Sequence, residues 1–299
     1  MFEFKCALTG IGSTHEMFRR LFDSMGPETL LSHLATVVRA NKADRQESII
    51  RFASRRVLDS LLDSLGGMAE GMVIETYLTF FMAGTLRGPA GQILECRLPR
   101  ILFSRKGAWP LLQLAHRRVT NKNKTTHHWR VDPNKPERYL TFFPTGNHCP
   151  PMSLSDTPDE ASLRALRPHN IPFYEYRQSD LDIPHIPTGY YQPAHGSQAA
   201  FDGFLYDQPQ NRAIVFQCTT AKRHDTKAAG FDWLREAGVE IWFVVVHGGQ
   251  DLDMVVAEAA QWGTLADHRF SLKVTADDLR EAINFKLKPQ CPSFLKRVT

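Results

Sequence analysis

Length, composition and charge place the chain among soluble globular proteins and leave its function open. With 299 residues, of which 42% are hydrophobic, the chain is long enough to build one large domain or two of ordinary size. Its net charge of +4, from 36 Lys and Arg against 32 Asp and Glu, does not separate a nucleic-acid-binding protein from an ordinary enzyme.

The cysteines and the apolar runs exclude several further classes. Cys6, Cys96, Cys149, Cys218 and Cys291 are scattered without a CxxC pair, so neither a disulfide framework nor a zinc knuckle is indicated. No segment approaches the roughly 18 uninterrupted apolar residues of a membrane helix, and the N-terminal sequence has no apolar run of signal-peptide length. We therefore expect a protein without a membrane partner that acts inside the cell, in the nucleus or the cytoplasm; a leader removed by processing stays open.

Residues 1–88 are predicted to form an N-terminal helical region. Apolar residues recur at helical spacing from Leu30 to Val38 and again from Ile49 to Leu65, where Gly66 and Gly67 end the stripe. A third segment, Met68 to Met82, is apolar on most sides and is expected to be a buried helix.

Residues 89–299 are predicted to form a second domain. A helix that contains Glu95 starts near Ala90, and Pro99 would lie in its interior unless the helix kinks there. A short strand follows at residues 138–143. Eight prolines between residues 150 and 198 then indicate a long irregular insertion, at about residues 144–198.

A strongly basic segment lies between Glu95 and Asp132, where the sequence contains no acidic residue. A solvated loop and a surface that faces nucleic-acid phosphates are about equally consistent with such a run. The candidate nucleic-acid-binding residues of this segment are Arg97, Arg100, Arg105, Lys106, Arg117, Arg118, Lys122, Lys124 and Arg130.

The second half of the chain predicts an α/β fold with a mixed central sheet. Strands are expected at residues 201–206, 213–219 and 239–246, with a helix at 224–237 between the last two. A helix at 251–262, a strand from Arg269 to Val274 and a helix at 276–285 complete the chain. Together with the Glu95 helix and the strand at 138–143, the order is αβββαβ.

The strand pair 201–206 and 213–219 carries a polar constellation typical of metal-dependent nucleases. Asp202 stands at the start of the first strand and Gln217 near the end of the second, where their oxygens would bind Mg²⁺ or Mn²⁺. Thr219 occupies the position where a lysine would orient water and offset developing charge. The nearby residues Lys222, His224 and Lys227 are candidates to provide a cation, an acid or base, or a helix cap.

Structural roles compete with these chemical ones. Asp202 is about equally consistent with an acid that caps a turn, and a strand Gln such as Gln217 often satisfies backbone groups. The neighbours His148 and Cys149 allow a Cys/His hydrolase, but loop residues are the simpler interpretation.

Three blocks of sequence resemble the PD-(D/E)xK restriction-endonuclease-like superfamily, and within it the Crinkler and RHS (retrotransposon hot spot) effector proteins. The blocks are AGQILECRLPRIL around Glu95, YYQPAHGSQAAFDGFLYD leading to Asp202, and IVFQCTTAKRHDTKAAGFDWL, which contains Gln217 and Thr219. The resemblance covers roughly residues 88–247. It implies a restriction-endonuclease-like core and a metal-dependent DNase-like domain, with Glu95 as a further metal ligand or water-positioning base.

The chain departs from the family pattern at two positions. Thr219 replaces the usual lysine, and Pro99 stands near a position where similar proteins often carry a histidine. The first hypothesis is a Mg²⁺-dependent endonuclease that acts on DNA. The alternative is a catalytically inactive nuclease-fold module that binds nucleic acid or a partner protein as an intracellular effector. Oligomeric state, and membership of a longer protein, stay open.

Overall fold

The computed structural model describes fewer residues than the sequence contains. The described residues are 35–39, 48–52, 77, 81, 87–104, 107–121, 124–142, 152–157, 171–177, 181–183, 185–193, 201–220, 223–225, 231–248, 253–256 and 268–283. The chain divides into two compact units, Met1–Cys96 and Arg97–Thr299.

The first unit contains a short antiparallel strand pair where the sequence predicts helix. Strands β1 (Ala35–Arg39) and β2 (Ser48–Phe52) pair from Ala35 with Phe52 to Arg39 with Ser48. For these residues the helical prediction is wrong, because ATVVR and SIIRF are rich in β-branched side chains, which favour strands over helices. Elsewhere in residues 14–86, only the helical positions Tyr77 and Phe81 are described, with ring centroids 5.8 Å apart.

Helix α5 (Arg87–Ser104) begins in the first unit and ends in the second. It confirms the predicted helix around Glu95, and Pro99 lies inside it without ending it. A proline removes one backbone hydrogen bond from a helix interior and disfavours continuity there. The buried side chains of Leu98, Ile101 and Leu102 supply compensating apolar contacts.

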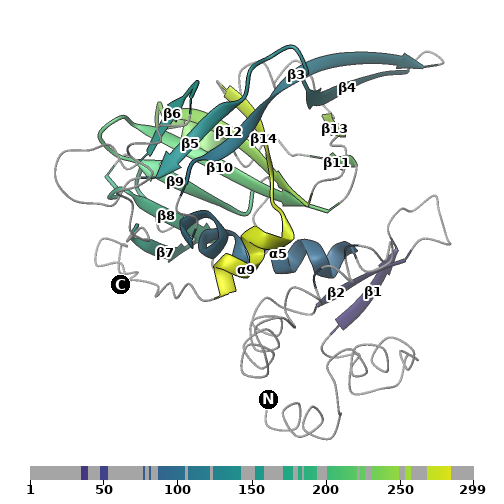
Figure 1. Ribbon diagram of the computed structural model, residues 1–299, viewed down its shortest axis with the longest axis horizontal. Coiled ribbons are helices and arrows are strands. Elements are labelled where there is room, and N and C mark those ends of the chain that lie inside the picture. The colour runs from purple at the N-terminus through teal and green to yellow at the C-terminus, as the bar shows by residue number, and fades with distance from the viewer. Residues whose placement is uncertain are drawn as a thin grey trace, which may run out of the picture. The chain divides into compact units, whose positions relative to one another are not determined.

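The second unit is built on a mixed sheet of twelve connected strands (Figure 1). Their order is β11-β13-β4-β3-β14-β12-β10-β9-β8-β7, and β5 pairs with both β3 and β6. The α/β class and the mixed central sheet are thereby confirmed. The strands are β3 (Trp109–Asn121), β4 (Lys124–Val131), β5 (Arg138–Phe142), β6 (Met152–Ser155), β7 (Phe173–Tyr176), β8 (Gly189–Pro193), β9 (Gly203–Asp207), β10 (Arg212–Thr219), β11 (Arg223–Asp225), β12 (Glu240–His247), β13 (Asp253–Val256) and β14 (His268–Lys273).

The centre of the sheet is formed by three parallel strands, β10, β12 and β14. The run IWFVVVH in β12 is buried throughout, as expected of a strand covered on both faces. Strand β9 lies antiparallel to β10, and β8 lies antiparallel to β9. The strands predicted at 201–206, 213–219, 239–246 and 269–274 are thus confirmed to within a few residues.

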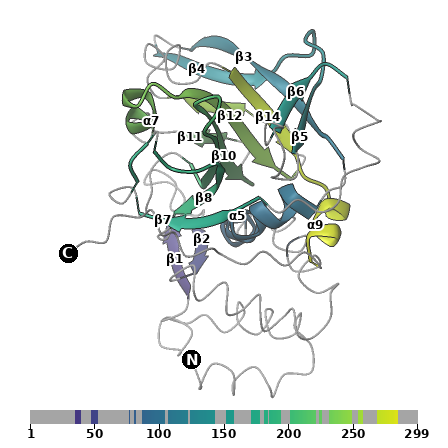
Figure 2. The same cartoon turned by 90° about the vertical axis from the view of Figure 1, so that its left-hand side faces the viewer.

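Helices cover both faces of this sheet (Figure 2). Helix α7 (Asp232–Glu236) packs Leu234 into a core with Val215 of β10 and Phe243 of β12. On the opposite face, Phe103 of α5 contacts Tyr190 of β8, with ring centroids 5.7 Å apart, and Tyr190 in turn contacts Phe216. Helix α9 (Ala276–Ile283) lies beside the second half of α5 in both views and confirms the predicted C-terminal helix.

Four sequence predictions about elements are corrected. The strand predicted at 138–143 exists as β5, but it pairs with β3 and β6 rather than with β9, so it is not the first strand of the predicted core. The insertion predicted as irregular contains β6, β7 and β8. The segments FYEY of β7 and GYYQP of β8 form strands despite the flanking prolines, because their Tyr and Phe side chains are largely buried.

The remaining two corrections concern helices that begin as strands. Residues 223–225 form β11, and helix is present only at Asp232–Glu236 of the predicted 224–237. Residues 253–256 form β13, which pairs with both β11 and β4, so the β-branched Val255 and Val256 extend the sheet. Among the helices of the described residues, none is both long enough and apolar enough to cross a membrane.

Candidate functional site

Asp202 is fixed against the end of strand β10 by two hydrogen bonds. Its backbone N–H donates to the carbonyl of Phe216 at 2.8 Å, and its Oδ2 accepts the backbone N–H of Cys218 at 2.6 Å. The carboxylate thus takes the place of a strand acceptor where β9 begins, and it lies beside the strand position of Gln217. This contact is the turn-capping role that the sequence allowed, and it also brings the two predicted ligands to neighbouring positions.

Polar side chains replace apolar ones at the carboxyl ends of the three parallel strands. In the strand register Gln217 is aligned with Val245 and Thr219 with His247, while Val245 is aligned with Ser271 of β14. Aligned residues of neighbouring strands project from the same face of a sheet. One polar row on the α7 face is therefore formed by Gln217, Thr219, His247 and Ser271. None of these four side chains is more than 7% exposed.

His247 and Ser271 are the members of the polar row that the sequence does not predict. His247 Nε2 lies 2.7 Å from Ser271 Oγ, and both side chains are buried. The only sequence signal is that His247 ends a long apolar strand, where a polar side chain marks the rim of the sheet. Ser271 gives no such signal, because its proximity to His247 depends on the pairing of β12 with β14.

The donor chemistry of this end of the sheet fits a hard divalent cation. Asp202 supplies a carboxylate and Gln217 an amide oxygen, and Mg²⁺ is commonly held by one or two carboxylates with several waters completing its shell. Across the described residues no three His, Cys, Asp or Glu side chains are grouped as a metal cluster. A cation here would therefore rely on a single carboxylate together with neutral oxygens.

The other predicted site residues are placed as follows. Glu95 is partly buried on the part of α5 that belongs to the first unit, so its role as a further ligand stays a prediction. His224 lies in β11 rather than at a helix start, which removes its predicted helix-capping role. Lys222, Lys227, His148 and Cys149 lie outside the described residues.

Within the described residues, the basic segment forms the end of α5 and a long β-hairpin, and not a loop. Arg117 and Arg118 of β3 are exposed, while Arg130 of β4 and the α5 residues Arg97 and Arg100 are partly buried. Lys124 starts β4, and the remaining predicted residues, Arg105, Lys106 and Lys122, lie outside the described residues. The sequence alternates weakly between apolar and polar residues here, which is why its composition resembles that of a loop.

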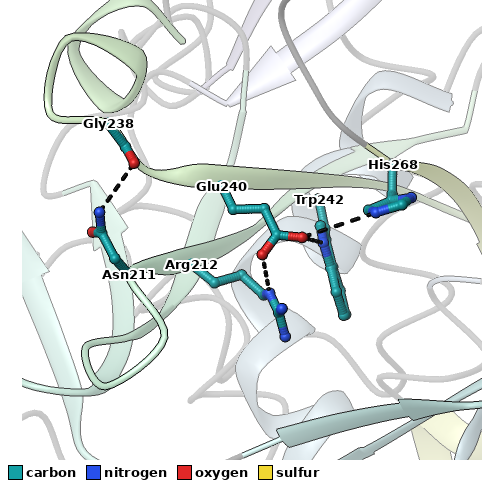
Figure 3. Close-up of polar contacts among 6 residues, drawn as sticks. All are labelled: Asn211, Arg212, Gly238, Glu240, Trp242 and His268. Atoms are coloured by element: carbon teal, nitrogen blue, oxygen red, sulfur yellow. Dashed lines mark hydrogen bonds and ion pairs between the residues drawn. The ribbon is translucent and has the colours of Figure 1, made fainter.

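A second polar cluster lies at the opposite edge of the sheet, at the amino ends of the parallel strands (Figure 3). Arg212 Nε donates to Glu240 Oε2 at 2.7 Å, and its guanidinium lies 4.1 Å from the ring centroid of Trp242. Trp242 Nε1 donates to Glu240 Oε1 at 2.7 Å, and His268 is 3.9 Å from the same oxygen. Burial alone would raise the pKa of Glu240, but these hydrogen bonds and charges lower that pKa below its usual value.

Asp207 lies next to this cluster and is fully buried. It is aligned with Arg212 across the β9–β10 pair, yet neither of its carboxylate oxygens has a hydrogen-bond partner among the described residues. Burial raises the pKa of the Asp207 carboxyl, and the charge of Arg212 offsets this only in part. The group therefore weakens the fold in its charged form.

No family model, curated protein or solved structure matches this chain.

Proposed function

We propose that the end of strand β10 is the active site of a Mg²⁺-dependent endonuclease that hydrolyses phosphodiester bonds, with DNA as the substrate. The observation that carries the proposal is the fixing of Asp202 beside Gln217 by its bonds to Phe216 and Cys218. This pair lies at the carboxyl ends of parallel strands, where open α/β sheets bind their ligands.

The order of elements around this site supports a restriction-endonuclease-like core. Strands β8, β9 and β10 form an antiparallel succession, α7 follows, and β12 returns parallel to β10. This is the βββαβ part of the expected order, with β8 in the place that was predicted for residues 138–143. Helix α5 precedes it in the chain with Glu95 on its first half.

The residues have different roles in the proposed reaction. Asp202 and Gln217 would hold the cation. When bound, Mg²⁺ neutralises charge on the phosphate and makes water more acidic. Ser271 holds the ring of His247 at the same end of the sheet, which makes His247 a further candidate for moving a proton. Lys222 or Lys227 would offset negative charge in place of the lysine that Thr219 replaces.

Nicking of supercoiled plasmid with Mg²⁺ or Mn²⁺ tests the proposal. Asp202→Asn retains an oxygen that can accept the N–H of Cys218, so the fold is expected to survive while the ligand charge is lost. We expect nicking to fall on the order of 100-fold. Asp277→Asn, which removes an exposed carboxylate on α9, serves as the matched control and is expected to nick like the wild type. Equal nicking by all three proteins, or by none, contradicts the proposal.

A binding module without catalysis is the second candidate. It is favoured by the neutral residues Gln217 and Thr219 and by the use of one Asp202 oxygen as a strand cap. In that case no protein nicks the plasmid, while wild type and Asp202→Asn bind DNA or a protein partner equally well. Fluorescence anisotropy without metal distinguishes the two candidates, because it reports binding independently of cleavage.

A further inference from the structure

The β3–β4 hairpin extends beyond the rest of the sheet (Figure 1). Near its base, β3 pairs with β5 and β14 through residues 109–113, and β4 pairs with β13 through residues 127–130. Residues 119–121 and 124–126 pair with each other and, within the described part of the chain, with no other strand. We call residues 117–121 and 124–126 the hairpin tip.

Positive charge is present on both faces of this hairpin. Arg117 and Arg118 are consecutive strand residues, so their side chains project from opposite faces, and both are exposed. The sequence around them has no acid between Glu95 and Asp132, and Lys124 begins the other strand of the tip. A flat anionic surface, such as a membrane, would contact only one face. A groove with phosphates on both walls would contact both.

The tip also carries an exposed apolar side chain. Val119, 37% exposed, is the only large hydrophobic residue that is exposed in the described part of the chain. It directly follows the two arginines. An apolar side chain between cations is suited to contact a base edge, such as a thymine methyl group, while the cations contact the backbone phosphates.

The base of the hairpin is held rigid by ring contacts. His116 Nε2 lies 2.9 Å from His127 Nδ1, on the neighbouring strand. His116 also contacts Trp129, with ring centroids 5.3 Å apart, and the guanidinium of Arg269 lies 4.2 Å from the Trp129 ring centroid. Burial, followed by the nearby His127 and Arg269, lowers the pKa of His116 and so favours its neutral ring, and a hydrogen bond between two imidazoles needs at least one neutral ring as acceptor.

We infer that the β3–β4 hairpin is a two-stranded ribbon that enters the major groove of B-form duplex DNA. The groove is about 12 Å wide and admits a two-stranded ribbon, whose strands lie about 4.8 Å apart and whose two side-chain faces span about 10 Å. A-form duplex RNA has a major groove too deep and narrow to admit it. This inference rests on the proposed function, because it names the form of the substrate.

Fluorescence anisotropy in EDTA tests this inference on the full chain, with labelled duplex DNA of about 20 base pairs. The probes for comparison are a single strand and an RNA duplex of the same sequence. We expect wild type to bind duplex DNA at least about tenfold more tightly than either. Arg117→Ala/Arg118→Ala should weaken duplex binding by about tenfold or more. It should also reduce the slope of log K against log salt by about 2, since each lost phosphate contact removes about 0.9.

The matched control is Arg235→Ala/Arg280→Ala, which also removes two exposed arginines but from α7 and α9. Its affinity is expected to stay within about twofold of the wild type. Val119→Asp provides a second variant at the tip that leaves both arginines in place, and it should lower affinity for duplex DNA by placing an anion in the groove. Thermal melts establish that all variants are folded.

Three results would overturn the inference: equal loss in both arginine pairs, equal affinity for DNA and RNA duplexes, or binding to anionic vesicles in preference to DNA. These measurements report binding alone, because they are made in EDTA. A hairpin that fails the binding test leaves the Asp202 nicking result unaffected, and an inactive site leaves the binding result unaffected. The two failures are therefore distinguishable.

Discussion

Gln217 decides how strongly the proposed site can hold a cation, because it supplies an oxygen without a charge. Gln217→Glu would add a carboxylate beside Asp202, and affinity for hard divalent ions rises with the number of charged ligands. We expect Mn²⁺ to raise the melting temperature of this variant at a concentration about tenfold lower than for the wild type. Gln208→Glu, in the exposed β9–β10 turn, adds the same charge as a control. An unchanged Mn²⁺ response in Gln217→Glu would remove Gln217 from the metal site.

Asp207 predicts a pH dependence of stability with a definite sign. Its pKa is raised in the folded protein, so the folded state binds the proton more tightly than the unfolded state. The unfolding free energy therefore falls as pH rises from the unfolded pKa through the folded one. Asp207→Asn should raise the unfolding free energy at neutral pH by about 1–3 kcal/mol, and the gain should vanish at acidic pH. Urea unfolding across this pH range measures it.

Glu240 provides the opposite case and serves as the control for Asp207. Its pKa is lowered in the fold, so its stabilising effect is present above the unfolded pKa and is lost as pH falls through the folded one. Glu240→Gln is therefore expected to lower stability at neutral pH by about 1 kcal/mol, with the difference shrinking in acid. If both variants change stability in the same direction at neutral pH, the assignment of opposite pKa shifts is wrong.

At the scale of elements, the β9–β10 turn depends on one residue with unusual backbone geometry. Asn211 has a φ of 48°, its Oδ1 accepts the Tyr206 hydroxyl at 2.9 Å, and its Nδ2 donates to the Gly238 carbonyl at 3.0 Å. Asn tolerates this left-handed conformation better than most residues.

Two substitutions at Asn211 separate backbone from side-chain effects. Asn211→Gly can adopt the positive φ angle without strain and loses only the side-chain hydrogen bonds. Asn211→Ala loses these hydrogen bonds and is also strained at that φ angle. We expect Ala to lower the unfolding free energy by about 1–3 kcal/mol and Gly to lower it by less. Thermal or urea unfolding compares them. A larger loss with Gly would mean that the φ angle is not the limiting feature.

Elements were predictable where local pattern and local contacts agree. The run IWFVVVH is apolar throughout and forms β12. Helix α9 begins with a reciprocal cap, in which Thr275 N–H donates to Asp278 Oδ2 at 2.7 Å and Thr275 Oγ1 accepts the Asp278 N–H at 3.3 Å. The hairpin could not be predicted in this way, because its polar residues form a strand only through pairing with each other.

The close approach of β8 to β9 is another feature that could not be predicted from the sequence. A Cβ on Gly203 would lie 2.4 Å from the hydroxyl of Tyr190, which is packed against Phe103 and Phe216. Gly203 is therefore required next to Asp202 because a neighbouring strand fills the space. Nothing in its own segment indicates this.

At the scale of the whole molecule, the order of strands could not be obtained from the sequence. Local pattern located β10, β12 and β14 individually, but the placement of β14 between β12 and β3 joins residues 268–273 to residues 111–113. The polar row follows from this placement, since Ser271 meets His247 only when β14 pairs with β12. Asp202 and Gln217, on strands adjacent in sequence, were accessible to sequence analysis, and His247 with Ser271 were not.

The position of β14 has a consequence for the synthesis of the chain on the ribosome. Strand β3 is made early, and β14, which fills the gap between β3 and β12, is made more than a hundred residues later. Until β14 emerges, two apolar strand edges at the centre of the sheet have no partner, and such edges invite pairing with other chains. The nascent protein is thus expected to depend on chaperone protection until β14 is complete.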